Sequence, residues 1–145
     1  WAENRIDRKS NSGYVCFLGG GTISWACRKQ SCVSLSSTEA EYIALAETCQ
    51  EVVWLRDISK EFSIWNENSI TINVDNQSCM KMVGRKKFSN RTKHVDTKFH
   101  FISDLKEQNY ISLKYCPTDI NIADMLTKPL QSVKLSQLRV KANVV

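Results

Sequence analysis

The sequence is poor in histidine and contains no long apolar run. Its two histidines, His94 and His100, and six cysteines without a C-x-x-C pair cannot be assembled into a zinc site of the usual spacing. No apolar run approaches the about 18 residues of a membrane span, and no charged and then hydrophobic leader opens the chain. Internal repeats and low-complexity segments are also lacking. The chain begins at Trp1 rather than at a methionine, so we expect a piece of a longer polypeptide.

The composition is that of an ordinary globular domain. The 145 residues are 42% hydrophobic and 24% charged, which indicates one domain with a core of its own. The formal charge of +5 is compatible with a polyanionic partner but does not require one. Several of the cysteines fall within apparent strands or helices, where cysteine behaves as a small apolar residue, so we expect buried, reduced thiols of an intracellular protein.

The hydrophobic pattern predicts an α/β fold with one mixed sheet. Residues 12–18 and 22–28 alternate around Gly19-Gly20-Gly21, which is typical of a β-hairpin. The elements predicted after the hairpin are a long helix to about residue 62, a strand at 70–75, a short helix to about 83, a helix at 92–108, a strand at 110–115, and a short helix at 119–128 that Thr118 caps and Pro129 ends. The tail from Leu130 is amphipathic and basic, and either packs as a helix or frays.

The long helix carries a carboxylate near its start. We expect Thr38 to cap it, and Ser/Thr-x-x-Glu capping boxes can be written as Ser36/Glu39 and as Thr38/Glu41. The predicted buried stripe consists of Leu45, Thr48, Val52, Leu55 and Phe62. Glu41 lies four residues before Leu45, at the top of that stripe, whereas Glu39 should point away. Glu41 is therefore either a capping residue alone or a carboxylate that a cation must meet.

Three acidic residues, Glu41, Asp75 and Asp124, stand at element ends. Asp75 could instead cap the helix that follows it, and Asp124 could be a solvated helix residue. As a set, they are typical of an all-carboxylate magnesium site, because magnesium prefers hard oxygen ligands. Two such ions about 4 Å apart can activate water for phosphodiester cleavage.

A basic stretch follows the strand at 70–75. It is either a solvated charged loop or a platform that contacts phosphates independently of sequence. Its cations are Arg85, Lys86, Lys87, Arg91, Lys93 and Lys98, and Trp25, Arg28 and Lys29 of the hairpin could extend it. Ser37, Thr38 and Asn76 are further candidates for polar contacts to such a nucleic-acid partner.

Four motifs occur in a familiar order: SSTEAEY from Ser36, VDNQS from Val74, RTKHVD from Arg91 and IADMLTKP from Ile122. With Asp7-Arg8-Lys9-Ser10 and Ser12-Gly13-Tyr14-Val15, they extend over nearly the whole chain. The sequence resembles the RNase H domain of copia-type retrotransposon Pol polyproteins.

The resemblance implies an RNase H-like mixed sheet flanked by helices, and magnesium-dependent hydrolysis of the RNA strand of RNA–DNA hybrids. By motif, Glu41, Asp75 and Asp124 match the catalytic, metal-binding carboxylates, with two Mg²⁺ expected in the complete domain and no small-molecule cofactor. The implied partners are the hybrid and the reverse transcriptase and integrase regions of the same polyprotein, with no membrane. The implied location is the cytoplasm, in virus-like particles, with the nucleus as a second compartment. Residues 1–129 would form the domain and residues 130–145 a C-terminal tail of the polyprotein.

The sequence departs from this family at its beginning. The family's first aspartate lies in an Asp-Ala-Asp-Trp-Ala stretch, of which this chain keeps only Trp1-Ala2. That aspartate and most of its central strand, between the hairpin and the strand at 70–75, would be missing, and Asp7 aligns elsewhere. A histidine that many related enzymes carry after the last strand is replaced by Thr118 and Asp119. We therefore expect the isolated chain to bind the metal pair poorly and cleave little. The alternative is a non-catalytic, nucleic-acid-binding transposon remnant.

Overall fold

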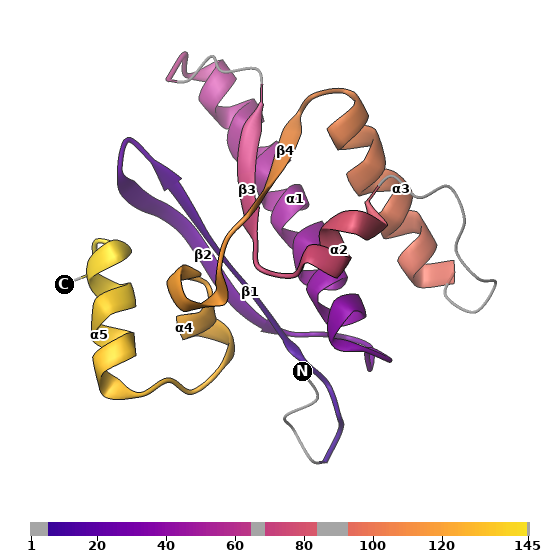
Figure 1. The fold of residues 1–145 in the computed structure, drawn as a ribbon. Coiled ribbons are helices and arrows are strands. Elements are labelled where there is room, and N and C mark those ends of the chain that lie inside the picture. Colours follow the sequence, from indigo (N-terminus) through magenta and orange to yellow (C-terminus); the bar gives the residue numbers. More distant parts are fainter. Residues whose placement is uncertain (1–5, 65–68, 84–92, 145) are drawn as a thin grey trace.

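The computed structural model describes residues 6–64, 69–83 and 93–144 (Figure 1). The first two strands, β1 (Asn11–Leu18) and β2 (Gly21–Lys29), form an antiparallel hairpin, as the alternation predicted. Gly19 and Gly20 turn the chain with φ of 58° and 81°, a region in which a residue with a Cβ atom is strained. The hairpin forms one edge of the molecule.

Helix α1 (Ser37–Glu61) is held at its start by a side-chain cap. Ser36 Oγ accepts a hydrogen bond from the Glu39 N–H at 3.1 Å, and the Glu39 carboxylate accepts one from the Leu35 N–H at 2.7 Å. The predicted cap at Thr38 is wrong, because Ser36, two residues earlier, caps the helix and Ser37 is its first residue. Glu39 is the carboxylate that stabilises the helix start, so Glu41 is free of that role.

Strands β3 (Ile70–Val74) and β4 (Ile111–Tyr115) form a parallel pair that packs with α1, α2 (Gln77–Met82) and α3 (Lys93–Glu107). The alternation of β3 is confirmed, since Ile72 and Val74 are buried and Thr71 and Asn73 are exposed. In α3, which was predicted as a helix at 92–108, Phe99, Ile102 and Leu105 are buried at helical spacing. These residues join one core cluster with Tyr42, Leu45, Ala46, Cys49 and Val52 of α1.

The C-terminal part differs from the single short helix predicted for 119–128. It forms a 3₁₀ turn (Thr118–Ile120), helix α4 (Asp124–Thr127) and helix α5 (Ser132–Lys141). Asn121 separates the first two in an extended conformation, and Thr118 lies inside the turn rather than capping a helix. Helix α5 packs back on the molecule, since Leu138 and Ala142 are buried and Thr22 Oγ1 donates a hydrogen bond to the Ala142 carbonyl.

The predicted α/β class is confirmed, and the strands of the described part form two two-stranded sheets rather than one sheet. A groove of about 360 Å³ lies between β1 and β3, over one side of α1. Four of the five residues of the predicted α1 stripe line this groove: Leu45 and Val52 are buried, whereas Thr48 and Leu55 are half-buried. Phe62 is 68% exposed, so its predicted burial is wrong, because α1 ends at Glu61 beyond the sheets.

The structure also bears on the predictions about the cysteines and about membrane-spanning segments. All six cysteines are free thiols, and Cys49 and Cys79 are buried, but Cys27 on β2 is exposed, contrary to the prediction for the set. Among the residues placed in the structure, no helix is both long enough and apolar enough to cross a membrane.

Candidate functional site

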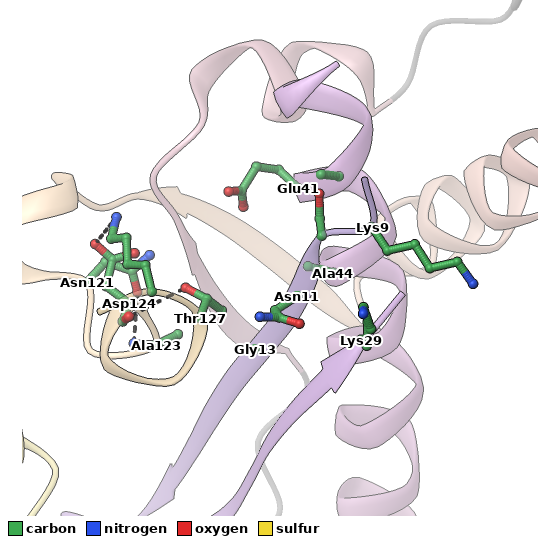
Figure 2. A pocket seen from close by; sticks show the side chains of 13 residues that line it. Lys9, Asn11, Gly13, Lys29, Glu41, Ala44, Asn121, Ala123, Asp124 and Thr127 are labelled. Carbon is green, nitrogen blue, oxygen red and sulfur yellow. Dashed lines mark hydrogen bonds and ion pairs between the residues drawn. The ribbon is translucent and has the colours of Figure 1, made fainter. Parts of the chain in front are cut away.

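A pocket of about 390 Å³ lies where the start of α1 faces β1 and the C-terminal turn (Figure 2). Glu41 enters it from α1 and Asp124 from α4, so two of the three predicted carboxylates share this pocket. Lys9, Lys29 and Lys128 also line it. The pocket therefore combines carboxylates with cations.

Asp75 lies next to this pocket rather than in it. It follows β3 directly, is half-buried and lines the groove between the two sheets. Glu41 lines both the pocket and the groove, and so links the other two carboxylates. Asp75 does not cap α2, because Asn76 Oδ1 accepts the hydrogen bond from the Cys79 N–H at 3.0 Å. The capping alternative for Asp75 is thus excluded.

The electrostatics of Glu41 show that the three carboxylates interact. Burial against the surrounding protein, and then the negative charges of Asp75 and Asp124, raise the pKa of Glu41 to about 7. Lys128 opposes this rise. Because the Glu41 side chain still reaches solvent, its desolvation is partial, and the repulsion from two carboxylates is the firmer cause. A cation at this point would relieve that repulsion.

Asp124 is the most buried of the three, with 6% of its surface exposed, so its solvated alternative is wrong. Lys128 Nζ lies 2.7 Å from Asp124 Oδ2, one helical turn further on. This ion pair offsets part of the negative charge of the buried carboxylate.

The position of Asp124 depends on close packing of α4 against β1. Asn121 Oδ1 accepts a hydrogen bond from the Ala123 N–H at 3.2 Å and so fixes the turn before α4. At Gly13 of β1, an added Cβ would lie 2.5 Å from Thr127 Cγ2 and 3.3 Å from Leu126 Cβ. Only glycine allows α4 to lie this close to the strand.

The donor chemistry suits a hard divalent cation, because all three side chains are carboxylates. Their spacing is too wide for a metal site in this structure, since no three His, Cys, Asp or Glu side chains of the described residues are grouped closely enough to hold a metal ion. Asp7 does not join them, since it pairs with Lys29. A metal would therefore require a further oxygen ligand or a closer approach of Asp75.

The predicted nucleic-acid contacts are only partly covered by the structure. Arg85, Lys86, Lys87 and Arg91 lie outside the described residues, as does the side chain of Lys93, the first residue of α3. Asn76 is half-buried, and its side-chain oxygen caps α2. Sequence reasoning missed Gly13, Lys9 and Lys128. Only Lys128 had a usable signal, its spacing of four residues from Asp124.

Sequence comparison relates the chain to retrotransposon Pol polyproteins. It is 38% identical over 122 residues, 84% of this chain, to the "Retrovirus-related Pol polyprotein from transposon TNT 1-94" of Nicotiana tabacum. It is 33% identical to the corresponding polyproteins from transposons RE2 and RE1 of Arabidopsis thaliana, over 100% and 99% of its length. The chain spans only about a tenth of these relatives, 9% of the first and 10% of the others. No protein-family model and no solved structure matches it.

Proposed function

We propose that this chain, a homologue of one region of retrotransposon Pol polyproteins, is an RNase H-type nuclease region that acts on the RNA strand of RNA–DNA hybrids. The observation that carries the proposal is the interaction of Glu41, Asp75 and Asp124, which come from a helix, a strand end and a turn far apart in sequence. The repulsion of Glu41 by Asp75 and Asp124 raises the free energy of the ionised site unless a cation is bound beside them. A carboxyl group whose pKa is raised in this way, as that of Glu41 is, is typical of catalytic sites.

Glu41, Asp75 and Asp124 would hold Mg²⁺, which when bound supplies an activated water and stabilises the charge of the leaving oxygen. Glu41 must lose its proton to serve as a ligand, and its raised pKa makes that loss depend on pH near neutrality. In the metal-free chain, the ion pair with Lys128 balances part of the negative charge of Asp124. Gly13 and Asn121 keep α4 in place, so that Asp124 faces Glu41 across the pocket.

The lysines of the pocket suit a phosphate backbone. Lys9 and Lys29 lie on the rim beside β1 and β2, close to the carboxylates. Cations placed so would bind backbone phosphates irrespective of sequence and would make affinity depend on salt. Other regions of the same polyprotein are the expected protein partners.

The test is cleavage of a hybrid that carries a label on its RNA strand, by a form of the chain extended upstream of Trp1, with magnesium and with EDTA. Asp75→Asn is the diagnostic variant, because Asp75 is half-buried and caps nothing, so its loss should remove cleavage without unfolding the chain. Asp119→Asn is a matched control, since Asp119 is exposed and only approaches Lys134 at 3.5 Å. Equal loss in both variants, or cleavage that persists in EDTA, would refute the proposal.

A second function, hybrid binding without cleavage, is favoured by the absence of a closed three-residue metal group among the described side chains. It predicts salt-dependent binding that Lys9→Ala and Lys29→Ala weaken, together with no magnesium-dependent product under any condition. The same cleavage assay therefore separates the two functions.

A further inference from the structure

A buried glutamine joins the hairpin to the start of α1. Gln30 directly follows β2 and is 2% exposed. Its backbone N–H donates to the Ser10 carbonyl at 2.8 Å, which extends the pairing of the hairpin by one residue. Its side-chain Nε2 donates to Ser12 Oγ of β1 and to the Ala40 carbonyl of α1, both at 2.9 Å. Ser34 Oγ, from the loop between β2 and α1, donates to Gln30 Oε1 at 2.7 Å. One amide group therefore contacts a strand, a loop and a helix.

The orientation of the Gln30 amide is dictated by its partners. The Ala40 carbonyl can only accept, so the amide nitrogen must face it, and the amide oxygen then faces the Ser34 hydroxyl. The side chains at this junction are buried, since Ser12, Gln30 and Ser34 are each 2% exposed. Because a buried polar group is costly when it loses its partner, the junction resists separation of the strand, the loop and the helix.

The two partners of the amide nitrogen are chain neighbours of residues that build the candidate site. Ser12 precedes Gly13, at which α4 packs closely against β1. Ala40 precedes Glu41 and itself lines the pocket. The amide therefore connects the strand that supports α4, with its carboxylate, to the helix turn that carries the carboxylate of Glu41.

The hydrogen bonds that cap α1 cannot make this connection, because they are local. Ser36 Oγ accepts from the Glu39 N–H, and the Glu39 carboxylate accepts from the Leu35 N–H. These bonds shape the first turn but leave its distance from β1 undetermined. The two bonds of the Gln30 amide nitrogen instead reach 10 and 18 residues along the chain.

We propose that Gln30 is a positioning residue of the nuclease site, which sets the separation of Glu41 from Asp124 through Ala40 and Ser12. The inference rests on the proposed function, because it gives Gln30 a part in holding these carboxylates ready for a cation. Ligands that are held in place lose less freedom when a cation binds, so Gln30 contributes to the affinity for the cation. Since Gln30 is buried, it acts without touching the hybrid.

The test is calorimetric titration of magnesium into the form extended upstream of Trp1. Gln30→Met keeps the approximate volume of the side chain but removes its donors, and should raise the dissociation constant for magnesium about tenfold or more. In hybrid cleavage, the half-maximal magnesium concentration should rise to match, whereas the rate at saturating magnesium should change little. Ser12→Ala removes one bond of the same amide nitrogen and is the second variant in case Gln30→Met does not fold.

Ser34→Ala is the matched control. Ser34 is as buried as Gln30 and bonds to the same amide, but on its oxygen side. Its loss should therefore lower stability in urea without changing the affinity for magnesium. A merely structural role of Gln30 predicts instead that magnesium affinity falls with stability in both variants.

A measurement without magnesium separates this inference from the nuclease proposal. In ¹⁵N spectra of the extended form, Gln30→Met should shift the amide of Asp124 as well as that of Glu41, whereas Ser34→Ala should leave the amide of Asp124 unchanged. An unshifted Asp124 in Gln30→Met, unchanged magnesium affinity in that variant, or an equal loss of affinity in Ser34→Ala would overturn the inference. If the extended form binds no magnesium at all, the nuclease proposal fails, and the amide of Asp124 still decides whether Gln30 sets the separation of the two carboxylates.

Discussion

Gly13→Ala is expected to displace α4 and with it the carboxylate of Asp124. The added methyl carbon would lie 2.5 Å from Thr127 Cγ2, far inside the about 3.5–4.0 Å at which carbon atoms attract. Separating them requires a movement of about 1 Å of a helix turn that also carries Leu126, 3.3 Å from the same point. The backbone of Gly13 has no positive φ, so the clash alone opposes alanine.

The magnitude follows from two opposing effects. Overpacking of this kind costs about 1–3 kcal/mol. Alanine also restricts the unfolded chain, which favours folding by about 0.4–1 kcal/mol. We therefore expect Gly13→Ala to lower the free energy of unfolding by about 1–2 kcal/mol.

The assay is urea denaturation, with Thr127→Ser as the compensating change. Serine lacks the Cγ2 atom that the new methyl group meets, so Gly13→Ala/Thr127→Ser should recover most of the loss. In the form extended upstream of Trp1, magnesium-dependent cleavage should fall with Gly13→Ala and return with Gly13→Ala/Thr127→Ser. If Gly13→Ala alone is as stable as the original chain or more stable, the close approach of α4 to β1 is refuted.

Further predictions concern the start of α1 and the charge of Glu41. Ser36→Ala should cost about 1 kcal/mol in urea denaturation because it removes the helix cap, whereas Ser37→Ala should change little; equal effects would contradict the cap. The folded-state pKa of Glu41, about 7, lies above its ordinary 4.5, so protonation of Glu41 stabilises the metal-free fold below pH 4.5, and this stabilisation is lost as pH rises through 7. Glu41→Gln should thus match the original melting temperature near pH 4 and exceed it near pH 8, and a difference independent of pH would refute the shift.

Local patterns predicted the fold well where one face of an element is buried. The alternation around Gly19 and Gly20 gave the hairpin, and the spacing of Phe99, Ile102 and Leu105 gave the core face of α3. The hairpin and the core face of α3 depend on neighbours within a few residues, which a sequence displays directly. The orientations predicted for the two glutamates are wrong, since Glu39 is 8% exposed and accepts a hydrogen bond from the Leu35 N–H, whereas Glu41 is exposed.

The remaining features depend on contacts between distant segments. Ser36 caps the helix rather than Thr38. Both residues fit the same local pattern, and only the conformation of the preceding loop decides between them. The close approach of α4 to β1 at Gly13 brings together residues that are far apart in the sequence. The α1 stripe was predicted as core throughout, yet part of it faces a groove, because periodicity does not reveal which strands cover a helix.

The central claim is tested most directly by magnesium-dependent cleavage of an RNA–DNA hybrid, in which this chain is compared with a form extended upstream of Trp1 and with Asp75→Asn in the extended form. We predict that the extended form cleaves the RNA strand, that Asp75→Asn abolishes this cleavage, and that the 145-residue chain cleaves little. Cleavage that survives Asp75→Asn, or an extended form that folds and binds the hybrid but never cuts it, would contradict the account.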